Sequence, residues 1–84
     1  MELTVKLYGI LRKYRPSSAE GMPHQPFTIS MPENSSVMDL IGLLEIVEGS
    51  VSATAVNGEA VDNETVLHEG DMVSLFPPAA GGQG

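Results

Sequence analysis

Residues 36–49 read SVMDLIGLLEIVEG, and this stretch contains the strongest helix signal in the chain. Ser36 and Asp39 have the spacing of a capping box, in which each side chain hydrogen-bonds a free backbone N–H at the start of a helix. Apolar residues then recur at spacings of three and four, which gives a helix one apolar face; they are Val37, Leu40, Ile41, Leu44 and Val47. Gly49 predicts the end of the helix. Gly42 costs about 1 kcal/mol relative to alanine inside a helix, and we attribute it to close packing against a sheet.

Strands are predicted on both sides of this helix. Apolar and polar residues alternate over 3–8 and 27–31, the period of two that indicates a strand with one buried face. Asn57-Gly58 is the strongest short hairpin turn signal because both positions need a positive φ, so strands are expected just before and just after it. A last strand is expected over 72–76, since Pro77-Pro78 must end it.

The order of strand, loop, strand, helix, strand pair and last strand predicts an α+β fold. It is compatible with a β-grasp, a mixed sheet of four to five strands with one main helix packed across it. Ile10, Leu11 and Tyr14 have the spacing of a short helical turn, and the proline- and glycine-containing stretch 15–26 is expected to be a loop. That loop is long enough to be either mobile or part of an interface. A ferredoxin-like arrangement would need a second full helix.

Length and composition narrow the function. A chain of 84 residues has room for one domain, which we divide into a β-grasp domain over 1–78 and a flexible glycine-rich tail over 79–84. Cysteine is absent, and neither a membrane-length apolar run nor a secretory leader is found, so we expect a cytoplasmic location without membrane contact.

The charge is strongly segregated along the chain. The net charge is -7, and the four basic residues all lie within 6–15. Such a surface disfavours nucleic acid, because phosphate binding depends on Lys and Arg. The acidic remainder serves either solubility or docking against basic partner surfaces.

We find no active-site motif. His24 and His68 are far apart in sequence and have no cysteine partner, which indicates exposed loop histidines rather than a metal site. The serines lie in no nucleophile elbow and the glycines in no phosphate loop. The chain is therefore predicted not to be an enzyme.

The tail, FPPAAGGQG over 76–84, is the remaining candidate. Two prolines fix φ and direct the chain away from the sheet. The four small residues 79–82 can span about 13 to 14 Å when extended, which suits a narrow tunnel. An ordinary frayed terminus is the alternative.

Five segments carry a resemblance to a known family. They are VKLYG (5–9), SVMDL (36–40), AVNGE (55–59), GDMVSLFPP (70–78) and AGG (80–82). Together they resemble the ubiquitin-like sulfur carriers of the MoaD type, the small subunit of molybdopterin synthase, with the thiamine carrier ThiS as a more distant relative. The resemblance covers nearly the whole chain, and the part from Gly70 to Gly82 is the most specific.

The resemblance implies a function for the tail. A ubiquitin-activating-type enzyme would adenylate the glycine carboxylate at Gly82, after Gly81, using ATP and Mg²⁺, and a sulfur donor would convert it to a thiocarboxylate. This chain would bind no cofactor itself. Its partners would be that enzyme, the molybdopterin synthase large subunit or another sulfur acceptor, and a processing protease, with partner contacts at 76–80: Phe76, Pro77, Pro78, Ala79 and Ala80. Phe76 either docks a partner or packs against Tyr8 or the first helical turn.

The extension Gln83-Gly84 departs from the family, whose diglycine ends the chain. Either a protease removes it, or Gly84 is itself activated, or the two residues are foreign to the natural chain or inactivate it. Other functions also stay open: a carrier for thiamine, tRNA thiolation or a secondary metabolite, a covalent protein modifier, and a non-covalent binding module.

Overall fold

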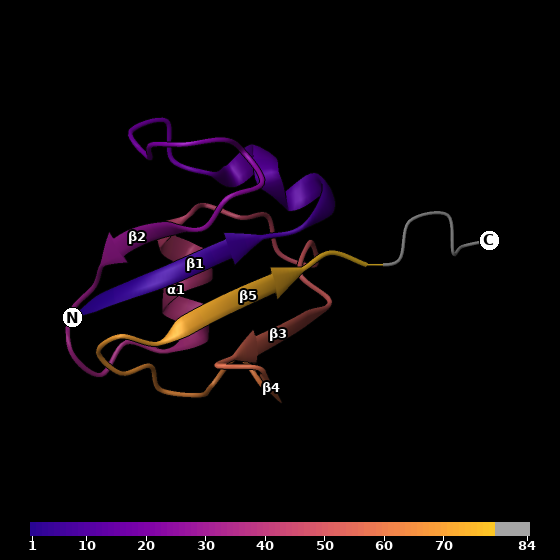
Figure 1. Ribbon diagram of the computed structural model, residues 1–84. Helices are drawn as coiled ribbons and strands as arrows, with labels where there is room; N and C mark the ends of the chain where they lie inside the picture. Colours follow the sequence, from indigo (N-terminus) through magenta and orange to yellow (C-terminus); the bar gives the residue numbers. More distant parts are fainter. Residues whose placement is uncertain (79–84) are drawn as a thin grey trace.

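The computed structural model describes residues 1–78, which form a five-stranded mixed sheet with one α-helix across one face (Figure 1). The elements in chain order are β1 (Glu2–Leu7), the 3-10 helix η1 (Gly9–Tyr14), β2 (Phe27–Ser30), α1 (Val37–Leu43), β3 (Ala53–Val56), β4 (Glu59–Val61) and β5 (Met72–Phe76). The strand order is β2-β1-β5-β3-β4. β1 and β5 are parallel, and the other neighbouring pairs are antiparallel. The predicted β-grasp fold and every predicted strand are confirmed. The predicted tail, 79–84, lies outside the described residues.

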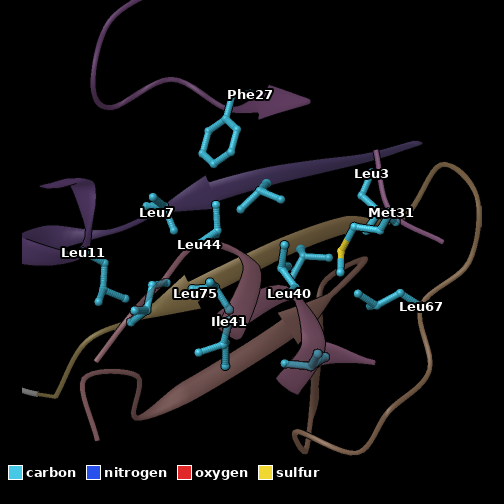
Figure 2. Packing of buried hydrophobic residues seen from close by; sticks show 14 residues of the cluster. Leu3, Leu7, Leu11, Phe27, Met31, Leu40, Ile41, Leu44, Leu67 and Leu75 are labelled. Carbon is cyan, nitrogen blue, oxygen red and sulfur yellow. The ribbon is translucent and has the colours of Figure 1, made fainter. Parts of the chain in front are cut away.

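The core lies between the sheet and α1, because the strands alternate as predicted. Leu3, Val5 and Leu7 of β1 are buried, as are Val73 and Leu75 of the adjacent β5. Figure 2 shows leucines of β1 and β5 together with Leu40 and Ile41 of α1 in one cluster. At about 1.5 to 3 kcal/mol per buried aliphatic side chain, this one layer provides the main stabilisation of a domain of this size.

The two predicted local signals with specific backbone requirements are both confirmed. Asn57 and Gly58 have φ values of 53° and 88° and connect β3 to β4, as a type I′ turn requires. Ser36 caps α1: its side chain accepts a hydrogen bond from the Asp39 N–H, and the Asp39 carboxylate accepts one from the Ser36 N–H.

The predicted end of the helix was wrong. α1 ends at Leu43, not near Gly49, and Val47 is 63% exposed whereas Ile46 is buried. The Glu45 N–H donates to the Gly42 carbonyl and the Ile46 N–H to the Ile41 carbonyl, the two bonds of a Schellman motif. Its left-handed residue is Glu45, with φ 58°. The chain turns there because Ile46 can then pack into the core beside Ile41.

The explanation offered for Gly42 was also wrong. Gly42 is exposed, and a Cβ placed on it would have no heavy atom within 4 Å. It therefore does not face the sheet, and close packing does not require a glycine there.

Candidate functional site

The candidate site is the end of the sheet at which β5 finishes. β5 lies in the middle of the sheet, between β1 and β3, so the chain that follows it emerges between two neighbours. η1 follows β1 and lies at this same end (Figure 1). We call this region, formed by Lys6–Tyr14, Ser52 and Phe76–Pro78, the exit end of the sheet.

Phe76 stacks on Tyr8 at the exit end. Alternation in β5 places Phe76 on the face opposite the buried Val73 and Leu75, as predicted. Its ring centroid is 4.5 Å from that of Tyr8, with 22° between the ring planes. Packing against Tyr8, one of the two roles considered for Phe76, is therefore present. Phe76 is still half-exposed, and its docking role remains a prediction.

The first proline after β5 is held on both sides. On the β3 side, the Ser52 N–H donates to the Phe76 carbonyl at 2.8 Å and the Ser52 hydroxyl to the Pro77 carbonyl at 2.9 Å. On the β1 side, Gly9 has φ +57°, and a Cβ there would lie 3.0 Å from Pro77 Cγ. Pro77 is half-buried and Pro78 exposed. Sequence reasoning missed Ser52, because a lone serine before a strand carries no distinguishing signal.

Ala79, Ala80, Gly81 and Gly82, together with the extension Gln83-Gly84, lie outside the described residues. Their roles as reacting and partner-contacting groups therefore stay predictions.

Three basic residues of the exit end form no ion pair within 4.0 Å with the residues that the structure describes; they are Lys6, Arg12 and Lys13. The ammonium groups of Lys6 and Lys13 lie instead over the rings of Tyr8 and Tyr14, at 5.1 and 5.4 Å from the centroids, a favourable cation–π distance. Positive charge is thus presented beside the exit of β5.

Arg15, the fourth basic residue, has a structural role in the 15–26 loop. Its guanidinium donates to the carbonyls of Ala19, Glu20 and Gly21 and lies 5.6 Å from the centroid of the Phe27 ring. Arg15 therefore organises the loop from within and ties it to β2.

No second centre of chemistry is found in the described part of the chain. Both histidines are exposed, as predicted, and residues 1–78 contain no group of three or more side chains placed to hold a metal ion. None of the helices formed by these residues has the length and apolar character needed to cross a lipid bilayer.

A mixed five-stranded sheet with this strand order and one α-helix across it is a β-grasp domain, the fold of the class of ubiquitin-like proteins. Comparison with known families makes the assignment specific: the model of the ThiS family matches residues 5–82. The chain belongs to the ThiS family, and its resemblance to the MoaD and ThiS type of sulfur carrier is confirmed.

Solved structures agree with this assignment. Subunit 1 of the molybdopterin-converting factor occurs in a complex with subunit 2 from Helicobacter pylori 26695; the similar chain of that structure is 29% identical, with 96% of this chain and 99% of that chain covered and a TM-score of 0.58. A protein assigned as molybdopterin converting factor, subunit 1, from Pyrococcus furiosus is 26% identical, with coverages of 93% and 98% and a TM-score of 0.66. SAMP1 from Haloferax volcanii, at 21% identity, coverages of 96% and 99% and a TM-score of 0.67, shows the shared fold. Among curated protein sequences, no significant match is found.

Proposed function

We propose that this chain is a sulfur carrier that acts through a thiocarboxylate formed at Gly82. The observation that carries the proposal is the extent of the family match, which begins at residue 5, includes Gly81-Gly82 and stops before Gln83-Gly84. Gly82, the proposed reacting residue, is the last position of the matched stretch. The arrangement of β5, Pro77 and Pro78 supports it, because it directs the chain out of the centre of the sheet.

The chemistry needs only the main-chain acid of this chain. A glycine carboxylate is ionised at neutral pH, and one oxygen attacks the α-phosphate of ATP while pyrophosphate leaves. Sulfide, as HS⁻, then attacks the carbonyl carbon of the acyl-adenylate, AMP leaves with the electron pair of the broken C–O bond, and loss of the S–H proton gives the thiocarboxylate. A residue without a side chain allows both approaches. ATP, Mg²⁺ and catalytic side chains are supplied by the activating enzyme, so this chain acts as a non-catalytic partner.

Docking would take place at the exit end. In this proposal Phe76, Pro77 and Pro78 contact the partner surface, and Ala79 and Ala80 pass through a narrow channel. A half-exposed aromatic residue beside the tail suits an interface anchor. The large subunit of molybdopterin synthase is the acceptor we favour, because one similar structure is a complex of subunits 1 and 2 of molybdopterin-converting factor.

We further propose that a protease removes Gln83-Gly84 before activation. With the extension present, Gly82 has no free carboxylate. Intact mass measurement of the protein from its native host tests this directly. A species ending at Gly82 is expected; full-length chain alone would contradict processing.

The activation step is tested with three chains ending at Gly81, Gly82 and Gly84. Each is incubated with ATP, Mg²⁺, the activating enzyme of the same host and a sulfide source. The chain ending at Gly82 is expected to gain the mass of one oxygen-to-sulfur exchange. Only a small fraction of the other two chains is expected to be converted. Isopeptide adducts to lysine would favour a covalent modifier instead, and no product from any chain would overturn the proposal.

The pathway is tested in a second step. The thiocarboxylated chain is offered to the molybdopterin synthase large subunit with its precursor, and in parallel to thiamine and tRNA thiolation enzymes of the same host. Sulfur transfer in the first reaction is expected. Transfer only in another reaction would keep the carrier function and reject the molybdopterin pathway.

A further inference from the structure

Pro77 lies one residue beyond the regular pairing of β5, yet it is not left free. The last pair between β3 and β5 joins Ala53 to Phe76. Proline has no N–H, so Pro77 and Pro78 cannot continue a ladder as donors. The Ser52 hydroxyl, 2.9 Å from the Pro77 carbonyl, adds one bond past that point.

The opposite side of Pro77 is limited by the β1 strand and its continuation. The Tyr8 N–H donates to the Leu75 carbonyl at 3.2 Å, the bond next to the end of β5 on this side. Gly9 follows in a left-handed conformation, and the space a Cβ would need there is taken up by the Pro77 ring. The Phe76 and Tyr8 rings stack just before this point.

We propose that Ser52 is a positioning residue that, opposite Gly9, holds Pro77 and thereby sets the direction in which the reactive tail leaves the domain. The inference rests on the proposed function, since only a tail that must enter a partner benefits from a defined direction. A small change of direction at the root of the tail moves its far end by a large distance. The five residues from Pro78 to Gly82 span at most about 17 Å, so a change of about 20° at their root displaces the far end of an extended tail by roughly 6 Å.

Loss of the Ser52 contact is expected to weaken productive binding to the partner and to leave the rate of the chemical step unchanged. A root that is held before docking loses less conformational freedom on binding. Ser52 is exposed and lies just before β3, and the proposed chemical steps use only the Gly82 carboxylate of this chain. Loss of its hydroxyl should therefore raise the KM for the carrier and leave kcat nearly unchanged.

The test compares Ser52→Ala and Ser52→Thr with wild type, all ending at Gly82, in adenylation by the activating enzyme. Losing one typical hydrogen bond corresponds to roughly a threefold to tenfold change. Ser52→Ala is expected to raise KM by about that factor at unchanged kcat, and Ser52→Thr to restore it because the hydroxyl is kept. Ser30→Ala is the matched control, since Ser30 is exposed on the edge strand β2. A wild-type KM for Ser52→Ala would overturn the inference.

A second measurement does not depend on activity. Ala79 carries the first backbone N–H after the two prolines, so its ¹⁵N relaxation reports how firmly the root is held. Ser52→Ala is expected to lower the order parameter of this amide, while Ser30→Ala leaves it unchanged. If wild type is not adenylated at all, the proposed function fails and this measurement still decides the role of Ser52: an unchanged order parameter rejects it.

Discussion

Among residues 1–78, Glu45 has a positive φ although it is neither glycine nor asparagine. With φ 58° it occupies the left-handed region that L residues avoid, at a cost of about 1 to 2 kcal/mol. Glycine removes that cost, but it loses more conformational entropy on folding, which lowers the free energy of unfolding by about 0.5 to 1 kcal/mol. Glu45→Gly is therefore expected to raise the free energy of unfolding by roughly 0.5 to 1 kcal/mol, measured by urea and thermal denaturation.

Glu48→Gly is the matched control for this substitution. Glu48 is also exposed and close by in sequence, but it does not have a positive φ. The Glu48→Gly variant should lose stability only because glycine loses more conformational entropy on folding. Equal losses in the two variants would show that the left-handed backbone at Glu45 carries no strain.

Gly42 provides an independent prediction at the C-terminal end of α1. Its surroundings are open, so Gly42→Ala adds a methyl group without a clash and reduces the entropy of the unfolded chain. We expect a gain of about 1 kcal/mol, which for a domain of this size raises Tm by about 4 to 8 °C. Gly58→Ala should instead lose stability, because φ is +88° there. A loss in Gly42→Ala would mean that the helix resists a side chain at this position.

At the scale of elements, predictions from sequence succeeded where a residue pattern has one main structural use. The Ser36 to Asp39 spacing located the start of α1, and Asn57-Gly58 located the β3–β4 turn. The end of α1 was missed because glutamate stands where glycine is usual, and because Ile46 rather than Val47 enters the core. The parallel pairing of β1 with β5 joins segments distant in sequence, so periodicity alone did not specify it.

The Ser36 cap of α1 should make a measurable contribution to the free energy of unfolding. The helix has seven residues, and helices this short are marginal without specific end contacts and packing. Ser36→Ala removes the acceptor for the Asp39 N–H and should lower the free energy of unfolding by about 1 kcal/mol. Ser36→Thr should retain most of it.

Denaturant unfolding measures both variants, with Ser17→Ala in the exposed loop as the control. A loss in Ser36→Ala no larger than that of the control would show that packing alone holds the start of α1.

At the scale of the whole molecule, the sequence indicated the candidate site only through its tail. It placed Phe76 on the correct face, because strand alternation is local. It could not indicate that Ser52 would meet Pro77, 25 positions later, since that contact depends on the register between β3 and β5. The comparisons show the family, whereas the roles of positions 79–84 remain predictions.

The uneven distribution of charge over the molecule should affect how fast it associates with a partner. The net charge is -7, while Lys6, Arg12 and Lys13 at the exit end have no ion-pair partner in residues 1–78. If this end approaches the activating enzyme first, these cations steer the encounter towards an acidic surface.

Lys13→Gln should then lower the association rate constant by about twofold to fivefold at low ionic strength. Ala60→Glu makes the same change in net charge on β4, at the far edge of the sheet, and should have much less effect. The difference should disappear near 1 M salt, where the screening length is about 3 Å. Stopped-flow measurement over a salt series tests this. Equal slowing by both variants would mean that only net charge matters, and faster association of Lys13→Gln would instead indicate a basic partner surface.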